Sequence, residues 1–202
     1  MIQPLFNTIS FEEFCQWLPS DKFYELHDGA IIEMNQPLGT HEKLVGYLIG
    51  EIVYQYKLNN LPYFIPNKAL VKPCDRNSAF LPDILLINND NLINEPLWEK
   101  YSTITTPDSA PLIIEVVNTN WRDDYYLKRG IYEEMRIKEY WICDYKPFGA
   151  SKFTGSPKQA TFIIHQLKED GYEEFSYQND QKIKSQLFPN LDLTVNQAIA
   201  IL

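Results

Sequence analysis

The chain has 202 residues, of which 45% are hydrophobic and 14% aromatic, enough to build the core of one domain spanning residues 1–202. Its formal net charge of −9 argues against a general nucleic-acid coat protein, which needs a basic surface, but it does not exclude a nuclease with acidic metal ligands. No segment approaches the ~20 uninterrupted apolar residues of a membrane span.

The N-terminal part of the chain is predicted to form a helix, a hairpin and a second helix. The S-x-x-E spacing at the start of residues 10–18 is that of a capping box and predicts a short helix. In residues 23–34, FYELHDGAIIEM, the pair Asp28-Gly29 predicts a tight turn between two strands. Apolar residues recur every three or four positions in residues 40–57 and predict an amphipathic helix.

The remaining chain is predicted to alternate strands and helices. Residues 161–167 and 172–177 read as antiparallel strands that extend the same sheet as the strands before them. The pattern favours a mixed α/β domain with one central sheet. The expected elements are an extended segment at 61–73, a strand at 80–88, a short helix near 95–100, a strand at 112–117, a helix at 122–136, a strand at 139–145, a loop at 147–158 and a helix at 194–202.

Two carboxylates interrupt the predicted core strands. Asp83 follows Pro82, which has no N–H and should break the strand ladder, so Asp83 can open into a cleft; it could instead cap a bulge or pair with a cation. Glu115 lies among apolar residues, and a buried glutamate without a partner should be protonated or metal-bound. The alternative for Glu115 is a salt bridge to Lys128 or Arg122 on the following helix.

A divalent cation would make the two carboxylates less costly to bury. Mg²⁺, or Mn²⁺ in its place, binds a few carboxylates and keeps several waters, so Asp83 and Glu115 are a plausible ligand pair. Such a metal can deprotonate water and offset the charge of a phosphodiester. A lysine would be expected two residues after the glutamate, where Val117 stands, and the nearest candidate is Lys128.

These motifs resemble those of a known family. FLPDILLI, then LIIEVVNTNWRDDY with a lysine on the following helix, then EYWICDY, resemble the Uma-two restriction-endonuclease domain family of the PD-(D/E)xK nuclease superfamily. The resemblance covers most of the chain and includes YELHDGAIIEM and LFPNLDLTVNQAI. It implies a restriction-endonuclease-like fold, with a mixed sheet flanked by helices, and divalent-metal-dependent hydrolysis of DNA.

The resemblance also implies site residues. Asp83 matches the aspartate of Pro-Asp, Glu115 the acidic residue of the second motif, and Lys128 a lysine that has migrated onto the helix. Glu25 and His41 match family positions that approach the site. Glu25 could instead be an ordinary strand carboxylate, and His41 could simply cap its helix.

The sequence departs from the family pattern at two further positions. Asn118 stands where many members have serine, which would alter hydrogen bonding around the site. Arg136 replaces a glycine that usually precedes the next strand, at some cost if the backbone there is left-handed. Neither change removes a proposed metal ligand.

Other features of the sequence have a structural interpretation. The aromatic residues of the segment 125–145, Trp141 among them, could stack on nucleic-acid bases but are more typical of an amphipathic core. Asp123 and Asp124 are expected to interact with the N-terminus of their helix. The three cysteines, Cys15, Cys74 and Cys143, are far apart and predict free thiols.

Two functions remain open from the sequence. One is a magnesium-dependent endonuclease acting on DNA, expected in the cytoplasm because no signal peptide is evident at the N-terminus and the thiols should be free. A homodimer would suit cleavage of both strands. The alternative is a catalytically inactive nuclease-fold module that binds nucleic acid or protein, which Val117 and the acidic charge favour.

Overall fold

The structure is a computed structural model that describes residues 8–20 and 22–202. The first seven residues, on which the expectation of no signal peptide rests, lie outside the described residues. Within the described ranges, no helix is both long enough and apolar enough to cross a bilayer. The cytoplasmic location stays a prediction.

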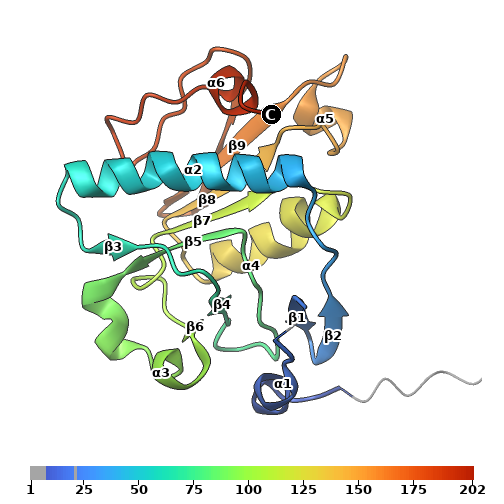
Figure 1. The fold of residues 1–202 in the computed structure, drawn as a ribbon, viewed down its shortest axis with the longest axis vertical. Coiled ribbons are helices and arrows are strands. Elements are labelled where there is room, and N and C mark those ends of the chain that lie inside the picture. Colours follow the sequence, from blue (N-terminus) through green and yellow to red (C-terminus); the bar gives the residue numbers. More distant parts are fainter. Residues whose placement is uncertain (1–7, 21) are drawn as a thin grey trace, which may run out of the picture.

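The predicted elements appear in the predicted order with differences at their ends (Figure 1). The structure adds a 3₁₀ helix at Asn89–Asn94, a short strand at Thr103–Ile104 and a short helix at Ser151–Thr154, which lies in the segment 147–158 that was predicted as a loop. The helices are α1 (Phe11–Trp17), α2 (Gly39–Leu58), α3 (Trp98–Tyr101), α4 (Arg129–Glu134), α5 (Ser151–Thr154) and α6 (Val195–Ile199), with a 3₁₀ helix η1 (Asn89–Asn94) and a π-helix η2 (Asp123–Lys128). The strands are β1 (Tyr24–His27), β2 (Ala30–Glu33), β3 (Tyr63–Phe64), β4 (Leu70–Val71), β5 (Ile84–Asn88), β6 (Thr103–Ile104), β7 (Leu112–Val116), β8 (Glu139–Asp144), β9 (Thr161–Lys168) and β10 (Gly171–Tyr177).

One mixed sheet organises the molecule. Within the described residues it has six strands in the order β10-β9-β8-β7-β5-β3. Only the β7–β8 pair is parallel, and the helical segment η2–α4 makes the crossover between these two strands. The strands β9 and β10 extend this sheet, which confirms the prediction of a single central sheet with helices around it.

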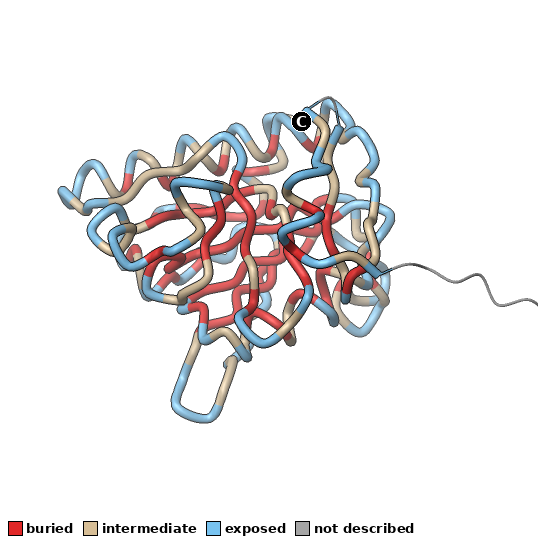
Figure 2. The backbone as a smooth tube through the Cα atoms, turned by 90° about the horizontal axis from the view of Figure 1, so that it is seen from below, coloured by how far each residue is buried: buried red, intermediate tan, exposed pale blue. Residues whose placement is uncertain are grey.

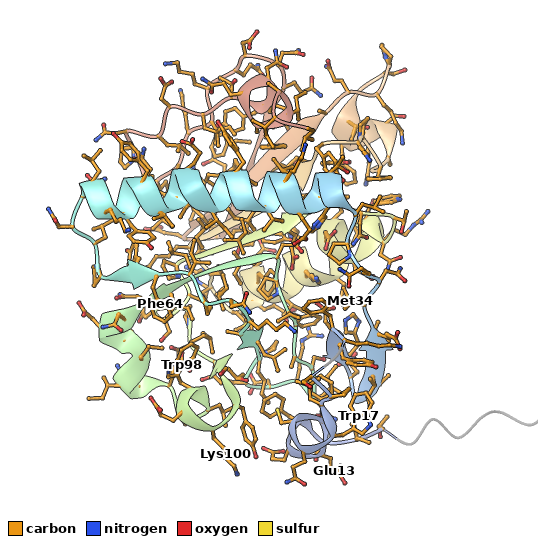
Figure 3. The ribbon with its side chains drawn as sticks, in the orientation of Figure 1. Glu13, Trp17, Met34, Phe64, Trp98 and Lys100 are labelled. Atoms are coloured by element: carbon orange, nitrogen blue, oxygen red, sulfur yellow. The ribbon has the colours of Figure 1, made fainter. Side chains whose placement is uncertain are left out.

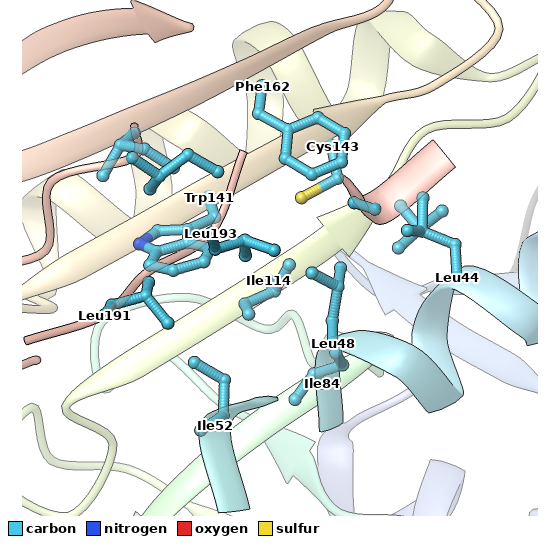
Figure 4. Close-up of a cluster of buried hydrophobic side chains, with 14 of the residues drawn as sticks. Leu44, Leu48, Ile52, Ile84, Ile114, Trp141, Cys143, Phe162, Leu191 and Leu193 are labelled. Atoms are coloured by element: carbon cyan, nitrogen blue, oxygen red, sulfur yellow. The ribbon is translucent and has the colours of Figure 1, made fainter. Parts of the chain in front are cut away.

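Helices cover both faces of the sheet, and the strands between them are buried (Figures 1 and 2). Figure 4 shows how Leu44, Leu48 and Ile52 of α2 pack onto side chains of the strands. The opposite face packs against η2 and α4, and there Ile113 and Val117 flank Glu115. Glu115 therefore points toward the crossover helix from the middle of an apolar face.

A small lobe containing α1 and the β1–β2 hairpin sits beside the sheet (Figure 1). The predicted capping box closes the start of α1, since the Ser10 side chain accepts from the Glu13 N–H and the Glu13 carboxylate accepts from the Ser10 N–H. The turn residues Asp28 and Gly29 have φ values of 48° and 86°, as the tight turn requires. A bridge between Leu26 and Ala79 ties the hairpin to the segment before β5.

The crossover helix differs from the uniform helix predicted at 122–136. Residues 121–122 are α-helical, the following η2 is π-helical, and α4 continues as an α-helix. The hydroxyl of Tyr140 donates to the main-chain oxygen of Asp124 at 3.0 Å, and side-chain insertion of this kind widens a helical turn. The helix α4 ends at Glu134, and Arg136, two residues later, has φ +63°, the left-handed backbone that a glycine adopts without strain.

A buried glutamate joins the C-terminal segment to the sheet. The carboxylate of Glu139, at the start of β8, accepts hydrogen bonds from the Trp141 indole at 2.9 Å and the Ser185 hydroxyl at 2.9 Å. It also accepts from the backbone N–H groups of Gln186 and Leu187. Glu139 and Trp141 are both fully buried, which confirms the core interpretation of Trp141.

Candidate functional site

The antiparallel pairing of β5 and β7 brings the two predicted carboxylates together. Ile84 pairs with Ile114, so Asp83 stands opposite Glu115 one position further along the ladder. The Asp83 N–H donates to Glu115 Oε2 at 3.3 Å, and the Val116 N–H donates to Asp83 Oδ2 at 2.7 Å. As the break at Pro82 predicted, Asp83 precedes the first residue of β5, and 27% of its side chain is exposed.

Lys128 is a buried cation at the centre of three carboxylates. Its Nζ lies 3.0 Å from Glu115 Oε1, 3.0 Å from Glu25 Oε1 and 3.7 Å from Asp124 Oδ1. Only 3% of the Lys128 side chain is exposed. Lys128 thus points inward from η2. It contacts Glu115, as expected for a lysine that stands on the helix and not two residues after the glutamate.

Asp124 is a member of this cluster that the sequence interpretation missed. It was expected to interact with the start of its helix, but its side chain is only 10% exposed and faces Lys128. The two residues are four positions apart, so the helix directs both toward the sheet. The i, i+4 spacing of an aspartate and a lysine was visible in the sequence, although it is more often found on a solvated face.

Glu25 enters the cluster from β1 of the small lobe. Besides contacting Lys128, it accepts from the Leu81 N–H at 3.1 Å and lies 2.8 Å from the Nε2 of His27. Burial would raise its pKa, but Lys128 together with these hydrogen bonds lowers the pKa of Glu25 to about 2. Glu25 is therefore ionised at neutral pH.

His41, in the first turn of α2, contacts the other side of Asp83. Its Nε2 lies 3.0 Å from the Val116 oxygen and 3.3 Å from Asp83 Oδ2, and its Nδ1 lies 3.1 Å from Glu42 Oε1. Burial would lower its pKa, but Asp83 and Glu42 raise the pKa of His41 to about 9. His41 is thus a cation at neutral pH whose two N–H groups both donate, and it does more than cap its helix.

The cluster holds more carboxyl groups than cationic side chains. Four carboxylates, those of Glu25, Asp83, Glu115 and Asp124, surround the two cations Lys128 and His41. Burial raises the pKa of Glu115 well above its usual range and that of Asp124 to about 7, and the neighbouring carboxylates add to both shifts. The carboxylates counteract burial at Lys128 and raise its pKa well above the usual value, so it stays charged.

Two connected hollows give access to these groups. A small polar cavity of about 30 Å³ is lined by Glu25, Asp83, Glu115, Asp124 and Lys128, among others, and has room for one water or a small ion. Beside it lies a cleft of about 360 Å³ between the start of α2 and the loops around Met34 and Lys68. The cleft and the cavity share four lining residues, which are Met34, Leu81, Asp83 and Asn118.

The carboxylates of Asp83 and Glu115 suit a hard cation that takes only a few of its ligands from the protein. In the described part of the chain, no group of three or more His, Cys, Asp or Glu side chains is arranged to hold one metal ion. Asp83 and Glu115 nevertheless provide oxygen donors beside a polar cavity that is lined by more carboxyl groups than cations. Mg²⁺ needs only one or two carboxylates because it keeps several waters, so these residues fit it.

The raised pKa of Asp124 predicts how stability depends on pH. In the folded state its pKa is about 7, against 3.8 for the free side chain, so the folded protein binds an extra proton between these values. The free energy of unfolding should therefore fall as the pH rises from about 4 to 7. Urea unfolding across this range should give a shallower slope for Asp124→Asn, while Asp90→Asn, at an exposed aspartate in η1, serves as the control. An unchanged slope in Asp124→Asn would contradict the assignment.

The five predicted site residues lie together. Asp83, Glu115, Lys128, Glu25 and His41 all meet around the cavity and the first turn of α2. Asn118 lines both hollows, and its side-chain oxygen accepts from the Asn120 N–H at 2.8 Å. The salt bridge between Glu115 and Lys128 and the proposed site therefore coexist.

Comparisons with known proteins agree with this architecture. The sequence model of the Uma2 family, described as "Putative restriction endonuclease", matches residues 11–196. A crystal structure described as a putative nuclease belonging to DUF820, from Anabaena variabilis ATCC 29413, superimposes with a TM-score of 0.71 at 14% sequence identity. That match covers 96% of this chain and 98% of the other, and it establishes a shared fold. No curated protein matches the sequence.

Proposed function

The chain belongs to the Uma2 family, and on that premise we propose that it is a divalent-metal-dependent endonuclease that hydrolyses DNA phosphodiester bonds. The observation that carries the proposal is the meeting of Asp83, Glu115 and Lys128 around one polar cavity that adjoins an open cleft. A purely structural ion pair would need neither the cavity nor the surplus of carboxylates.

The two carboxylates at the β5–β7 pair, those of Asp83 and Glu115, differ in their exposure to the cleft. Asp83 is partly exposed to the cleft, whereas Glu115 lies behind it with 3% of its side chain exposed. Both would hold the metal, which when bound would lower the pKa of a water and offset negative charge on the phosphate. The interlocking bonds from Val116 N–H to Asp83 and from Asp83 N–H to Glu115 fix the two carboxylates before any substrate arrives.

Lys128 serves as a fixed positive charge. Its raised pKa means that it stays protonated at neutral pH and does not abstract a proton from water. Glu25 and Glu115, each 3.0 Å from the Lys128 Nζ, take up two of its three N–H donors, and the third can orient a water in the cavity or stabilise charge that builds up on a phosphate oxygen. Of the two roles that a lysine could have here, positioning the water therefore fits and activating it as a base does not.

His41 contributes a second positive charge on the cleft side of Asp83. Its pKa of about 9 keeps it cationic, and it lines the cleft together with the exposed part of Asp83. A protonated His41 offsets part of the carboxylate charge that would otherwise repel a phosphodiester. Cleavage of both strands by a symmetric homodimer stays a prediction that follows from the single site in each chain.

One observation favours the alternative of an inactive nuclease-fold module that binds nucleic acid or protein. Lys128 is already held by Glu25, Glu115 and Asp124, and Val117 occupies the position where a lysine would be expected after the glutamate. In such a module the cluster would only stabilise the junction between the small lobe and the sheet. Binding of DNA without cleavage would identify this alternative.

Incubation with supercoiled plasmid tests the proposal. Wild-type protein should nick the plasmid with Mg²⁺ or Mn²⁺ and lose this activity in excess EDTA. A Glu115→Ala preparation, purified in the same way, gives the background from contaminating nucleases and should stay at that level. Equal trace nicking by the two proteins across both metals would refute the endonuclease.

A further inference from the structure

We propose that the 360 Å³ cleft beside Asp83 is a subsite for one unpaired nucleotide of the DNA strand being cut, so that the substrate is single-stranded or locally unpaired DNA. This inference rests on the proposed endonuclease function and adds the substrate class. The cleft borders the polar cavity at Met34, Leu81, Asp83 and Asn118. A nucleotide in the cleft would therefore have its phosphate close to the proposed reacting groups.

The size and shape of the cleft suit one nucleotide. Its volume of about 360 Å³ lies at the lower end of the range for small-molecule pockets, about 300–1,000 Å³. One wall is the exposed side of α2 near Gly46, and the other is formed by the segments that hold Met34 and Lys68. Figure 3 shows Met34 in the region between the small lobe and α2. Bases in a duplex are stacked and paired, so only an unpaired or flipped nucleotide could enter.

The cleft combines apolar contact surface with polar groups. Phe23, Met34 and Ile49 offer apolar surface on which a base can pack. The amides of Asn35 and Asn67 line the same space, and no hydrogen bond joins either side chain to another of the described residues. Asparagine amides provide both donors and acceptors and so can read the edge of an unpaired base.

A lysine stands at the rim of the cleft of this acidic protein. Lys68 is exposed and its Nζ lies 4.0 Å from the centre of the Phe23 ring, which keeps the charge at the cleft entrance. Near the start of α2, where His41 and Glu42 line the cleft, Lys146 donates to the Thr40 hydroxyl at 3.2 Å. A phosphate beside the bound nucleotide would meet the charge of Lys68.

Gly46 allows the cleft to be closed without disturbing the core. It lies on the exposed side of α2 and lines the cleft, and a Cβ built on it has no heavy atom within 4 Å. A leucine should therefore occupy cleft space while improving helix propensity. Gly50, one turn further along α2, has the same open surroundings but does not line the cleft, so Gly50→Leu is a matched control.

Fluorescence anisotropy with a labelled 16-nucleotide DNA tests the subsite, with Ca²⁺ in place of Mg²⁺ to keep the DNA intact. Wild type and Gly50→Leu should bind the single strand at least about tenfold more tightly than the same sequence in a duplex. Gly46→Leu should lose this preference, while both leucine variants unfold at or above the wild-type temperature. Salt dependence is measured as the slope of the logarithm of the association constant against the logarithm of the salt concentration. For single-strand binding, Lys68→Gln should reduce the magnitude of this slope by about 0.7.

The outcomes separate the subsite from the catalytic proposal. Single-strand binding by Gly46→Leu equal to that of wild type, or a wild-type preference for duplex, would overturn the subsite even if plasmid nicking remains metal-dependent. If Gly46→Leu loses the preference for single-stranded over duplex DNA and Gly50→Leu keeps it, the subsite is supported even when no cleavage occurs with any metal. No binding of either DNA form by wild type would overturn both the subsite and DNA as the partner.

Discussion

Replacing Lys128 with methionine should lower the free energy of unfolding by about 3–5 kcal/mol at pH 8 and abolish DNA cleavage. The substitution removes the one cation that contacts Glu25, Glu115 and Asp124, and all three carboxylates are buried. Methionine fills much of the same volume, so the loss reflects uncompensated charge and not a cavity. The measurement is urea unfolding together with plasmid nicking.

The pH dependence of the Lys128→Met variant identifies the cause of its instability. Without Lys128, the pKa of Glu25 should rise from about 2, and the raised pKa values of Glu115 and Asp124 should rise further. The folded variant then binds more protons than the unfolded chain, so its stability increases as the pH falls toward 5. The difference from wild type should accordingly be smaller at pH 5 than at pH 8.

A surface lysine provides the control for Lys128. Lys138 is 54% exposed and lies 3.9 Å from the exposed Asp108, so Lys138→Met should change the free energy of unfolding by no more than about 0.5 kcal/mol. If Lys128→Met were as stable as Lys138→Met at pH 8, the three contacts of Lys128 would not describe the protein in solution.

Asp83→Asn should reduce the rate of metal-dependent cleavage at least about a hundredfold while leaving the protein folded. The asparagine keeps a side-chain oxygen that can accept from the Val116 N–H, so the β5–β7 junction retains its hydrogen bond. What is lost is the negative charge that the proposed metal needs. Single-turnover cleavage in saturating Mg²⁺ measures the effect.

A second readout for Asp83→Asn does not depend on activity. Asp83 is the main partner that raises the pKa of His41 to about 9, so the variant should titrate His41 at lower pH in an NMR experiment. Asp90→Asn is the matched control, because Asp90 is exposed in η1 and should affect neither cleavage nor His41. Cleavage at the wild-type rate by Asp83→Asn would remove Asp83 from the site.

Most of the fold could be predicted from local sequence patterns. The capping box at Ser10, the Asp28-Gly29 turn and the apolar period of α2 each act through contacts between residues near in sequence, and each appears in the structure. The π-helical turn could not be predicted in this way. It coincides with a hydrogen bond from Tyr140 to the backbone of Asp124, and the two residues belong to different elements.

For the candidate site as well, some residues could be predicted from the sequence and others could not. The cost of burying carboxylates in apolar strands singled out Asp83 and Glu115, and the family resemblance added Lys128, Glu25 and His41. Asp124 was assigned to the start of its helix, because an aspartate near a helix N-terminus has a sufficient local explanation. Its burial against Lys128 depends on how the helix packs on the sheet.

The sequence by itself determined most of the elements, the single mixed sheet and the positions of one carboxylate just before β5 and another within β7. It did so because strand period, turn residues and helix caps are local properties. Only the tertiary structure decided that one lysine meets three carboxylates from three elements, and that a cleft lies beside Asp83. Those arrangements depend on contacts between β1, β7 and η2, whose geometry is set by packing across the sheet and not by any one segment.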